Sequence, residues 1–352
     1  MIDAFLQFND LLFKFVTRGP MWRHVAAFLP LGLAVGFLVA RWSARMVVRE
    51  SQGERHIPRW ARTTVILVMG ALYAIVVVAV MDGRCQWITE GGSIDWGHWR
   101  LLYHYTLIAF LVAATTVDFD QYLIPDEITG PGVLIGIIAA AGVSNMQMMQ
   151  VWVDWNQAHP ITGPYIPQWI KDHPHLHGLA FSVAGMVTGA GITWLARAVS
   201  EWVLGIEAMG LGDVTLMAMI GSFLGWQPVL FVFLLAPACG LVAAISSRLL
   251  WGKRALPYGP YLSAAAVLVL LTWRWLWTPT REIFGHWPTL LGLISGMIAS
   301  LALLLGLLRI YRSIPVELRT PEPTPESGNA PEHNSTTQAE SDTTAPTSES
   351  GH

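Results

Sequence analysis

Cysteine and charged residues are both scarce in this chain. The two cysteines, Cys85 and Cys239, are too few for a four-cysteine zinc site or a disulfide framework. Charged residues make up 13% of the sequence and hydrophobic ones 53%, and tryptophan occurs 17 times. Soluble domains carry about 25% charged residues, so this composition excludes an ordinary soluble core. It indicates a polytopic membrane protein in contact with the lipid bilayer, and the net charge of −3 gives no reason to expect a nucleic-acid partner.

A cleavable signal peptide is not expected at the N-terminus. Residues 1–23 place Asp3, Asp10 and Lys14 among apolar residues, without a basic start followed by a clean apolar stretch. The first strong membrane span is instead expected to begin near His24.

Nine apolar segments approach the length of about 20 residues that a helix needs to cross a bilayer. They cover residues 24–42, 63–81, 101–117, 127–144, 177–196, 213–226, 228–247, 258–277 and 289–309. Only Trp226-Gln227-Pro228 separates the sixth segment from the seventh, which is typical of a helical hairpin whose second helix begins at proline. The sequence therefore predicts an all-α, polytopic transmembrane bundle of about nine spans.

The composition changes abruptly after Arg319. Residues 320–352 are mostly Pro, Ser, Thr, Glu and Asn, with no aromatic and no large aliphatic side chain. Such a segment buries too little apolar surface to offset the entropy lost on ordering, so we expect a disordered tail.

Basic residues gather in alternate loops and orient the expected bundle. The basic loops follow the first, seventh and ninth segments and contain Arg45, Arg49, Arg55, Arg59, Arg62; Lys253, Arg254; and Arg309, Arg312, Arg319. Cytoplasmic loops carry an excess of Lys and Arg, so these loops are expected inside, with the N-terminus outside. The third segment then ends at Asp118 and the sixth begins at Asp213 on the same cytoplasmic face.

Two carboxylates at helix ends are the candidate chemical groups. Asp213 follows Gly210-Leu211-Gly212 at the start of an apolar segment, and Asp118 closes another. A charge beside hydrocarbon is costly and is more often functional than decorative, although Asp also suits a helix N-cap. Two carboxylates held together share one proton, so one activates water while the other polarises a carbonyl. The pair therefore favours aspartic-protease chemistry, which needs no cofactor.

Three motifs resemble the bacterial type IV prepilin peptidase family of GxGD intramembrane aspartic proteases. They are VDFDQYLIPD at 117–126, GIEAMGLGDVTLMAMIG at 205–221 and PYGPY at 257–261. The resemblance implies an endopeptidase that cuts the basic leader from type IV prepilins or pseudopilins at the cytoplasmic face of the plasma membrane. It assigns catalysis to Asp118 and Asp213 rather than to the neighbouring Asp120, and implies glycine as the residue before the cut.

The chain also departs from the family pattern. The loop 43–62 contains no cysteine, so it lacks the paired CxxC motifs of many members, and a cysteine-ligated zinc is excluded there. Many bacterial members also methylate the new N-terminus with S-adenosylmethionine; whether this chain uses that cofactor stays open. Thr215 replaces a common lysine, and the segment near 145–176 looks like an insertion.

Further residues are expected to support the site rather than to react. They are Pro125, Asp126, Glu207, Gly210 and Gly212. Asp126 suits a helix cap, the two glycines suit close backbone approach, and Glu207 only fits the motif. The segment 257–260 is expected to shape the site floor or to form an interfacial turn. His159, His173, His175 and His177 match no metal-ligand spacing, so no metal site is expected.

The expected organisation has four regions. They are an N-terminal membrane region (1–99), a catalytic membrane domain (100–270), an additional span (271–319) and the tail (320–352). The open alternatives are a non-catalytic scaffold derived from the family, a proton-coupled transporter and a protease of the signal-peptide-peptidase type. Helix-end carboxylates favour the peptidase, because a proton relay needs acids near mid-bilayer. The oligomeric state and the identity of the substrate are not predicted.

Overall fold

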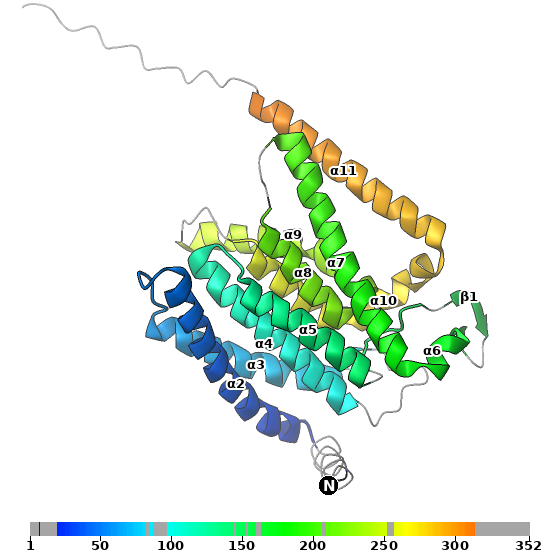
Figure 1. Ribbon diagram of the computed structural model, residues 1–352, viewed down its shortest axis with the longest axis horizontal. Coiled ribbons are helices and arrows are strands. Elements are labelled where there is room, and N and C mark those ends of the chain that lie inside the picture. Colours follow the sequence, from blue (N-terminus) through cyan, green and yellow to red (C-terminus); the bar gives the residue numbers. More distant parts are fainter. Residues whose placement is uncertain are drawn as a thin grey trace, which may run out of the picture. The chain divides into compact units, whose positions relative to one another are not determined.

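Helices dominate the computed structural model, which describes residues 20–81, 85–86, 97–143, 146–152, 154–159, 163–205, 209–251 and 257–313 together with Gln7. Ten helices and two strands occur in this part of the chain (Figure 1). The helices are α2 (Met21–Glu50), α3 (Arg59–Met81), α4 (Gly97–Gln121), α5 (Asp126–Gly142), α6 (Gln168–Asp172), α7 (Pro174–Leu204), α8 (Leu211–Leu224), α9 (Trp226–Trp251), α10 (Gly259–Gly285) and α11 (Trp287–Ser313).

The nine apolar segments predicted from the sequence fall in nine separate helices, α2–α5 and α7–α11, which confirms the polytopic helical bundle. Seven of these helices are long and apolar enough to cross a membrane, two fewer than predicted. The exceptions are α5, with 17 residues, and α8, with 14. At 1.5 Å per residue α8 is about 21 Å long, against roughly 30 Å of hydrocarbon.

The short helix α8 lies at the centre of the bundle, in contact with α4, α5, α7, α9 and α10. Its side chains from Leu216 to Leu224 are nearly all buried, as expected for a helix that is apolar on every side. Glycine permits its close contact with α7: a Cβ at Gly185 would lie 2.0 Å from the Gly221 carbonyl oxygen. Because protein surrounds α8, it need not span the bilayer to satisfy its backbone.

Buried hydroxyl groups tie the neighbouring helices to α8. Tyr103 Oη of α4 lies 2.9 Å from the Gly136 carbonyl oxygen of α5 and 3.0 Å from that of Ser222 in α8. Ser182 Oγ of α7 donates to the same Ser222 carbonyl at 2.7 Å. These contacts join four helices around one point, near the start of α4 and the last turn of α8.

A short antiparallel hairpin was not predicted from the sequence. It consists of β1 (Asp154–His159) and β2 (Gly163–Tyr165), with Asp154 opposite Tyr165. The hairpin lies in the inserted segment between α5 and α7, and it adds a small β element to the expected all-α fold.

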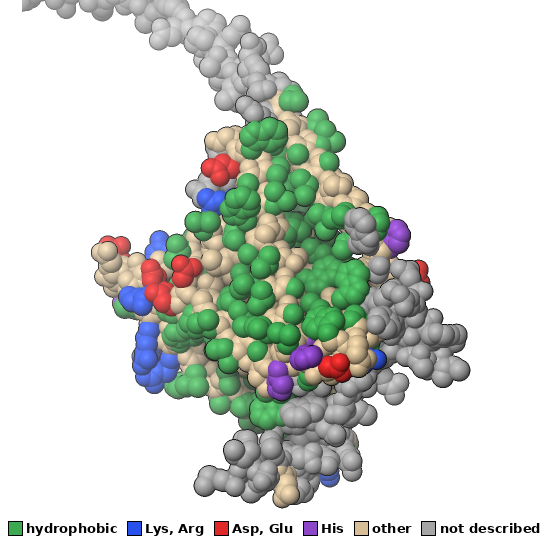
Figure 2. Space-filling model, turned by 45° about the vertical axis from the view of Figure 1, so that its right-hand side comes forward, with side chains coloured by type: hydrophobic (Ala, Val, Ile, Leu, Met, Phe, Trp, Pro, Cys, Tyr) green, Lys and Arg blue, Asp and Glu red, His purple; other side chains and the backbone are tan. Residues whose placement is uncertain are grey.

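The chain divides into two units, Met1–Tyr311 and Arg312–His352. The predicted disordered tail, 320–352, lies outside the described residues, and the four predicted regions stay predictions. On the visible face of the first unit, hydrophobic side chains cover a broad central area, while Lys, Arg, Asp and Glu gather toward its edges (Figure 2). This distribution suits a protein surrounded by lipid.

Candidate active site

The candidate site forms where the end of α4 meets the beginnings of α8 and α10. Asp118 lies in the last turn of α4, Asp213 in the first turn of α8, and Gly259 begins α10. The chain leaves α4 through Tyr122, which has a left-handed φ of 56° and donates its N–H to the Asp118 carbonyl at 2.9 Å. This turn directs residues 123–125 back across the site before α5 begins.

Asp118 is buried and has a backbone hydrogen-bond donor. Asp118 is only 4% exposed, and its Oδ2 accepts a hydrogen bond from the Gly259 N–H at 3.1 Å. Because Gly259 has no side chain, its backbone approaches the carboxylate closely: a Cβ there would lie 2.5 Å from Asp118 Oδ2. The PYGPY motif therefore contributes a group that touches Asp118.

Asp213 is the second buried carboxylate, in a residue 8% exposed. It interacts electrostatically with Asp118 and with the backbone N–H of Gly210, which precedes the helix. Its position in the first turn of α8 also places it where the helix dipole favours negative charge. The structure thus brings together the two aspartates that the sequence paired across 95 residues of chain (213 minus 118).

Ile124 packs between these elements and was not singled out in the sequence. A Cβ at Gly212 would lie 3.1 Å from the Ile124 Cβ, and a Cβ at Gly259 would lie 2.9 Å from the Ile124 Cδ1. Ile124 thus contacts the entrance of α8 and the start of α10 together. Ile124 belongs to the IPD part of the first motif. The sequence alone does not reveal which residues an apolar side chain contacts.

Tyr258 lies at the site directly before α10. Burial and, second, the charge of Asp213 raise the pKa of Tyr258 to about 12. The phenol is therefore neutral near pH 7 and retains its proton as a hydrogen-bond donor. The PYGPY motif therefore interacts with both carboxylates. Gly259 donates a hydrogen bond to Asp118, and Tyr258 interacts electrostatically with Asp213.

The remaining predicted residues fall into several groups. Pro125 is buried and precedes α5 as its N-cap residue, without a side-chain capping bond, whereas Asp126 is exposed in the first turn of that helix. Gly210 has ordinary extended backbone angles and a Cβ there would make only ordinary contacts, whereas close packing against Ile124 explains the glycine at 212. Thr215 donates to the Gly212 carbonyl at 3.1 Å, which steadies the first turn of α8. Glu207 lies outside the described residues.

Asp120 differs from Asp118 although both lie in the last turn of α4. It is half-buried, and its Oδ2 accepts a hydrogen bond from Gln121 Nε2 at 2.6 Å. The Arg55 guanidinium donates to its backbone carbonyl. These contacts belong to the rim of the helix end, so the buried partner of Asp213 is Asp118.

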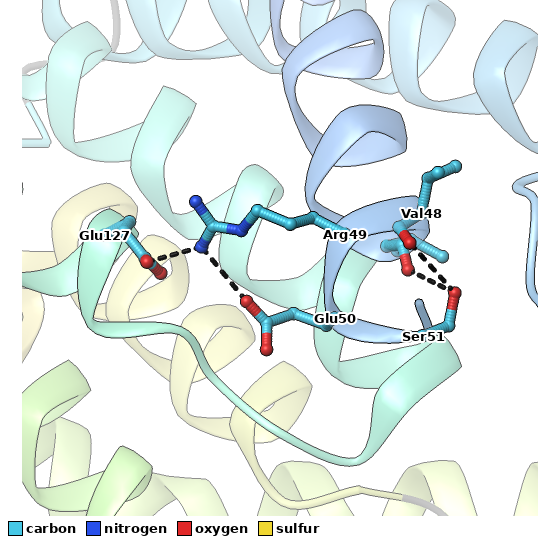
Figure 3. A network of polar contacts seen from close by, with 6 residues as sticks. Val48, Arg49, Glu50, Ser51 and Glu127 are labelled. Carbon is cyan, nitrogen blue, oxygen red and sulfur yellow. Dashed lines mark hydrogen bonds and ion pairs between the residues drawn. The ribbon is translucent and has the colours of Figure 1, made fainter. Parts of the chain in front are cut away.

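Basic residues at the end of α2 and in the loop that follows it lie at the same end of the bundle as the carboxylates. Arg49 forms an ion pair with Glu50 at 3.0 Å and a second one with Glu127 in the first turn of α5 (Figure 3). Ser51 Oγ closes α2 by donating to the Val47 carbonyl at 2.7 Å. Two arginines expected on the cytoplasmic side therefore contact the segments that carry Asp118 and Asp126.

Two buried, interacting carboxylates have a defined chemical capacity. Two carboxylates held close together do not both ionise readily, and such a pair can hold one proton between its members. The ionised group accepts a proton from water, and the protonated group donates to a carbonyl oxygen. Among the described residues, no group of three or more His, Cys, Asp or Glu side chains is placed to bind a metal ion.

Comparison with known proteins finds partial matches to one family. A model of the type IV leader peptidase family matches residues 170–245, which include Asp213. The prepilin leader peptidase/N-methyltransferase of Aeromonas salmonicida (strain A449) is 29% identical over 176 residues, 49% of this chain and 50% of the relative. The type 4 prepilin-like proteins leader peptide-processing enzyme of Escherichia coli O78:H11 is 30% identical over 164 residues, 47% of this chain and 49% of the relative.

A third relative is matched over a longer segment. The prepilin leader peptidase/N-methyltransferase of Neisseria gonorrhoeae is 28% identical over 223 residues, 61% of this chain and 62% of the relative. The chain thus spans about half to three fifths of the length of these curated relatives. No solved structure matches. With the three motifs and the helical bundle, these partial matches support a relationship of the chain to the type IV leader peptidase family.

Proposed function

We propose that this chain is an intramembrane aspartic endopeptidase that removes the basic leader from type IV prepilins or pseudopilins. The observation that carries the proposal is the meeting of Asp118 and Asp213, two buried carboxylates from distant motifs that interact at three helix ends. The relatives named as prepilin leader peptidases supply the class of substrate.

The proposed reaction uses the two carboxylates as a base and an acid. The ionised carboxylate takes a proton from water as the water oxygen bonds to the scissile carbonyl carbon. The protonated carboxylate donates to the carbonyl oxygen, giving a neutral tetrahedral diol. Collapse of the diol transfers a proton to the peptide nitrogen and breaks the C–N bond. Leader acid and mature amine leave, and the pair again holds one proton.

We place cleavage at the cytoplasmic face of the plasma membrane. Arg49 and Arg55 support this placement, because both contact the carboxylate end of the bundle and arginine-rich loops stay in the cytoplasm. A basic leader held on that side would meet the site where the apolar part of the substrate enters the membrane. The proposal covers proteolysis alone, since no residues of this chain are assigned to methyl transfer.

The test is co-expression with a type IV prepilin from the same bacterium. We expect Asp118→Asn and Asp213→Asn each to abolish processing, because the amide keeps the shape but cannot exchange the shared proton. Asp172→Asn is the matched control and should process normally, since Asp172 is an exposed carboxylate of the short helix α6 and does not line the site. Normal processing by both of the first two variants would contradict the proposal.

Mass spectrometry of the processed product adds a second readout. We expect a single cut directly after a glycine, where the leader meets the apolar helix. An unmodified prepilin in the presence of abundant wild-type protein would instead favour the scaffold or transporter alternatives.

A further inference from the structure

A groove of about 990 Å³ lies between α3, α4 and α10, beside the carboxylate pair. Its lining is mainly apolar, with a few hydroxyl groups and one carboxylate. The lining residues that matter most are Thr64 and Val68 of α3, Thr116 and Phe119 of α4, and Ser263 and Leu268 of α10.

The groove begins at the candidate site and runs into the bundle. Its lining includes Phe119 and Asp120, the neighbours of Asp118, and Pro260, which follows the Gly259 that donates to Asp118. Along α10 it extends from Pro260 to Leu271, and a rise of 1.5 Å per residue makes that about 16 Å. This length is roughly half of a hydrocarbon core of about 30 Å.

One buried hydroxyl group in the groove has no partner among the described residues. Ser263 is 5% exposed and lines the groove, yet its Oγ makes no hydrogen bond. Two other hydroxyls of the lining are satisfied within their own helices: Thr64 donates to the Trp60 carbonyl at 3.0 Å and Thr116 to the Val112 carbonyl at 2.7 Å. A buried polar group without a partner is costly, so Ser263 indicates a polar atom supplied by an occupant.

We propose that this groove holds the apolar segment of the substrate polypeptide that follows the scissile bond, with the Ser263 hydroxyl hydrogen-bonded to its backbone. The inference rests on the proposed function and names the surface that positions the substrate. One end of the groove is lined by Asp120 and Pro260, close in sequence to Asp118 and Gly259, so a chain lying in it would end near the two carboxylates. Ser263 is a positioning residue, one helical turn from Gly259.

A lipid acyl chain is the competing occupant, because its length also matches half of a bilayer. Hydrocarbon leaves the Ser263 hydroxyl unsatisfied, whereas a peptide carbonyl accepts its proton. The contact of the groove with the helix end that carries Asp118 also favours a polypeptide.

Photo-crosslinking separates the two occupants in the full-length protein in membranes. A photoreactive residue replaces Leu268 in the groove or, as the control, Leu134 on the exposed face of α5, both in an inactive Asp213→Asn background. The two positions lie eight to nine residues into their helices. We expect a prepilin adduct from position 268 and little from 134. Equal adducts at both positions, or lipid adducts alone at 268, would overturn the inference.

Processing kinetics give an independent arm. We expect Ser263→Ala to lower kcat/KM for prepilin about three- to tenfold, mainly through KM, as for one lost hydrogen bond, and Ser263→Thr to restore it. Ala264→Trp, which fills the groove from an exposed position, should lower kcat/KM at least tenfold, whereas Ile135→Trp on exposed α5 should not. Unchanged kinetics in both groove variants would contradict the inference.

The proposed function is judged separately, by wild-type processing in the same membranes. If wild-type protein cleaves prepilin but position 268 gives no adduct, the groove assignment fails and the peptidase proposal stands. If wild-type protein does not cleave, the peptidase proposal fails. The adduct at 268 then decides alone whether the groove accepts a polypeptide.

Discussion

Two of the regions that bury polar side chains, the surroundings of His177 and the carboxylate pair, differ in how these side chains are held. Around His177 of α7, both ring nitrogens are engaged: Nδ1 lies 2.7 Å from the Gln147 side-chain amide, and Nε2 accepts the Val151 N–H at 3.0 Å. Trp226 and Gln227 add hydrogen bonds to the carbonyls of Val151 and Gln150 at 2.7 and 3.0 Å. This cluster fastens the segment 146–151 to α7 and α9.

The carboxylate pair is held by backbone groups. A carboxylate offers about four acceptor positions, and the described residues supply one backbone N–H to each, from Gly259 to Asp118 and from Gly210 to Asp213. Incomplete hydrogen bonding does not by itself separate the two regions, because the side-chain oxygens of Gln147, Gln150 and Gln227 also lack a partner among the described residues. The comparison teaches that the difference lies in the groups themselves: the His177 cluster joins segments of the fold, whereas the other region brings two carboxylates together at three helix ends.

The largest effect of a glycine substitution is expected at Gly259. An alanine Cβ there would lie 2.5 Å from Asp118 Oδ2, so the carboxylate must move. A misplacement of about 1 Å costs on the order of 100-fold in rate, and we expect Gly259→Ala to lower kcat for prepilin by that factor. Gly210→Ala is the control, since its Cβ meets Asp213 at an ordinary 3.8 Å. Equal kinetics for the two variants would contradict this geometry.

The second prediction concerns the pH dependence of processing. One carboxylate must be ionised and the other protonated, so kcat/KM should fall on both sides of an optimum, about tenfold per pH unit on each limb. Asp172→Asn, in exposed α6, should leave the profile unchanged. A flat profile, or one with a single limb across the range in which the protein stays folded, would break the assignment of a shared proton.

A smaller effect is expected at Tyr258. Its neutral phenol lies close enough to Asp213 for the two to interact electrostatically, and Tyr258→Phe removes the donor but keeps the ring. We expect kcat to fall roughly tenfold, as for a group that assists proton transfer without carrying it, with membrane abundance unchanged. A loss as large as that of Asp213→Asn would mean that Tyr258 reacts directly.

The smallest effect on activity is expected at His177. His177→Ala removes a buried ring whose two nitrogens are both hydrogen-bonded, so the free energy of unfolding should fall by about 1–3 kcal/mol while kcat changes less than twofold. Thermal unfolding in detergent alongside prepilin processing measures both. Loss of activity at undiminished stability would erase the distinction between the two regions.

Much of the fold and of the site was predictable from the sequence. Apolar segments of membrane length located nine helices, and Asp118, Asp213 and the PYGPY motif were assigned to one end of the bundle by loop charges and family resemblance. The location of the helix ends was predictable because charged residues are rare within membrane helices, so those that occur mark where an apolar segment begins or ends. The assignment of the cytoplasmic face and the roles of the two aspartates stay predictions.

Other features depend on packing that the sequence does not display. Apolar segments look alike whether they face lipid or protein, so the enclosed and short α8 was predicted as a full span. The hydrogen bond from Gly259 and the contacts of Ile124 require the relative placement of α4, α8 and α10. Ser263 lies in a helix whose sequence contains several other hydroxyl groups, and only the surrounding contacts distinguish it.

Double-mutant kinetics test most directly whether Asp118 and Asp213 act as one unit. We would measure kcat for prepilin cleavage by Asp118→Asn, Asp213→Asn and the double variant in purified full-length protein. Groups that act as a unit are strongly non-additive, so we expect the double variant to be no slower than either single variant. Two independent losses that multiply in the double variant, or near wild-type cleavage by either single variant, would contradict the shared-proton pair.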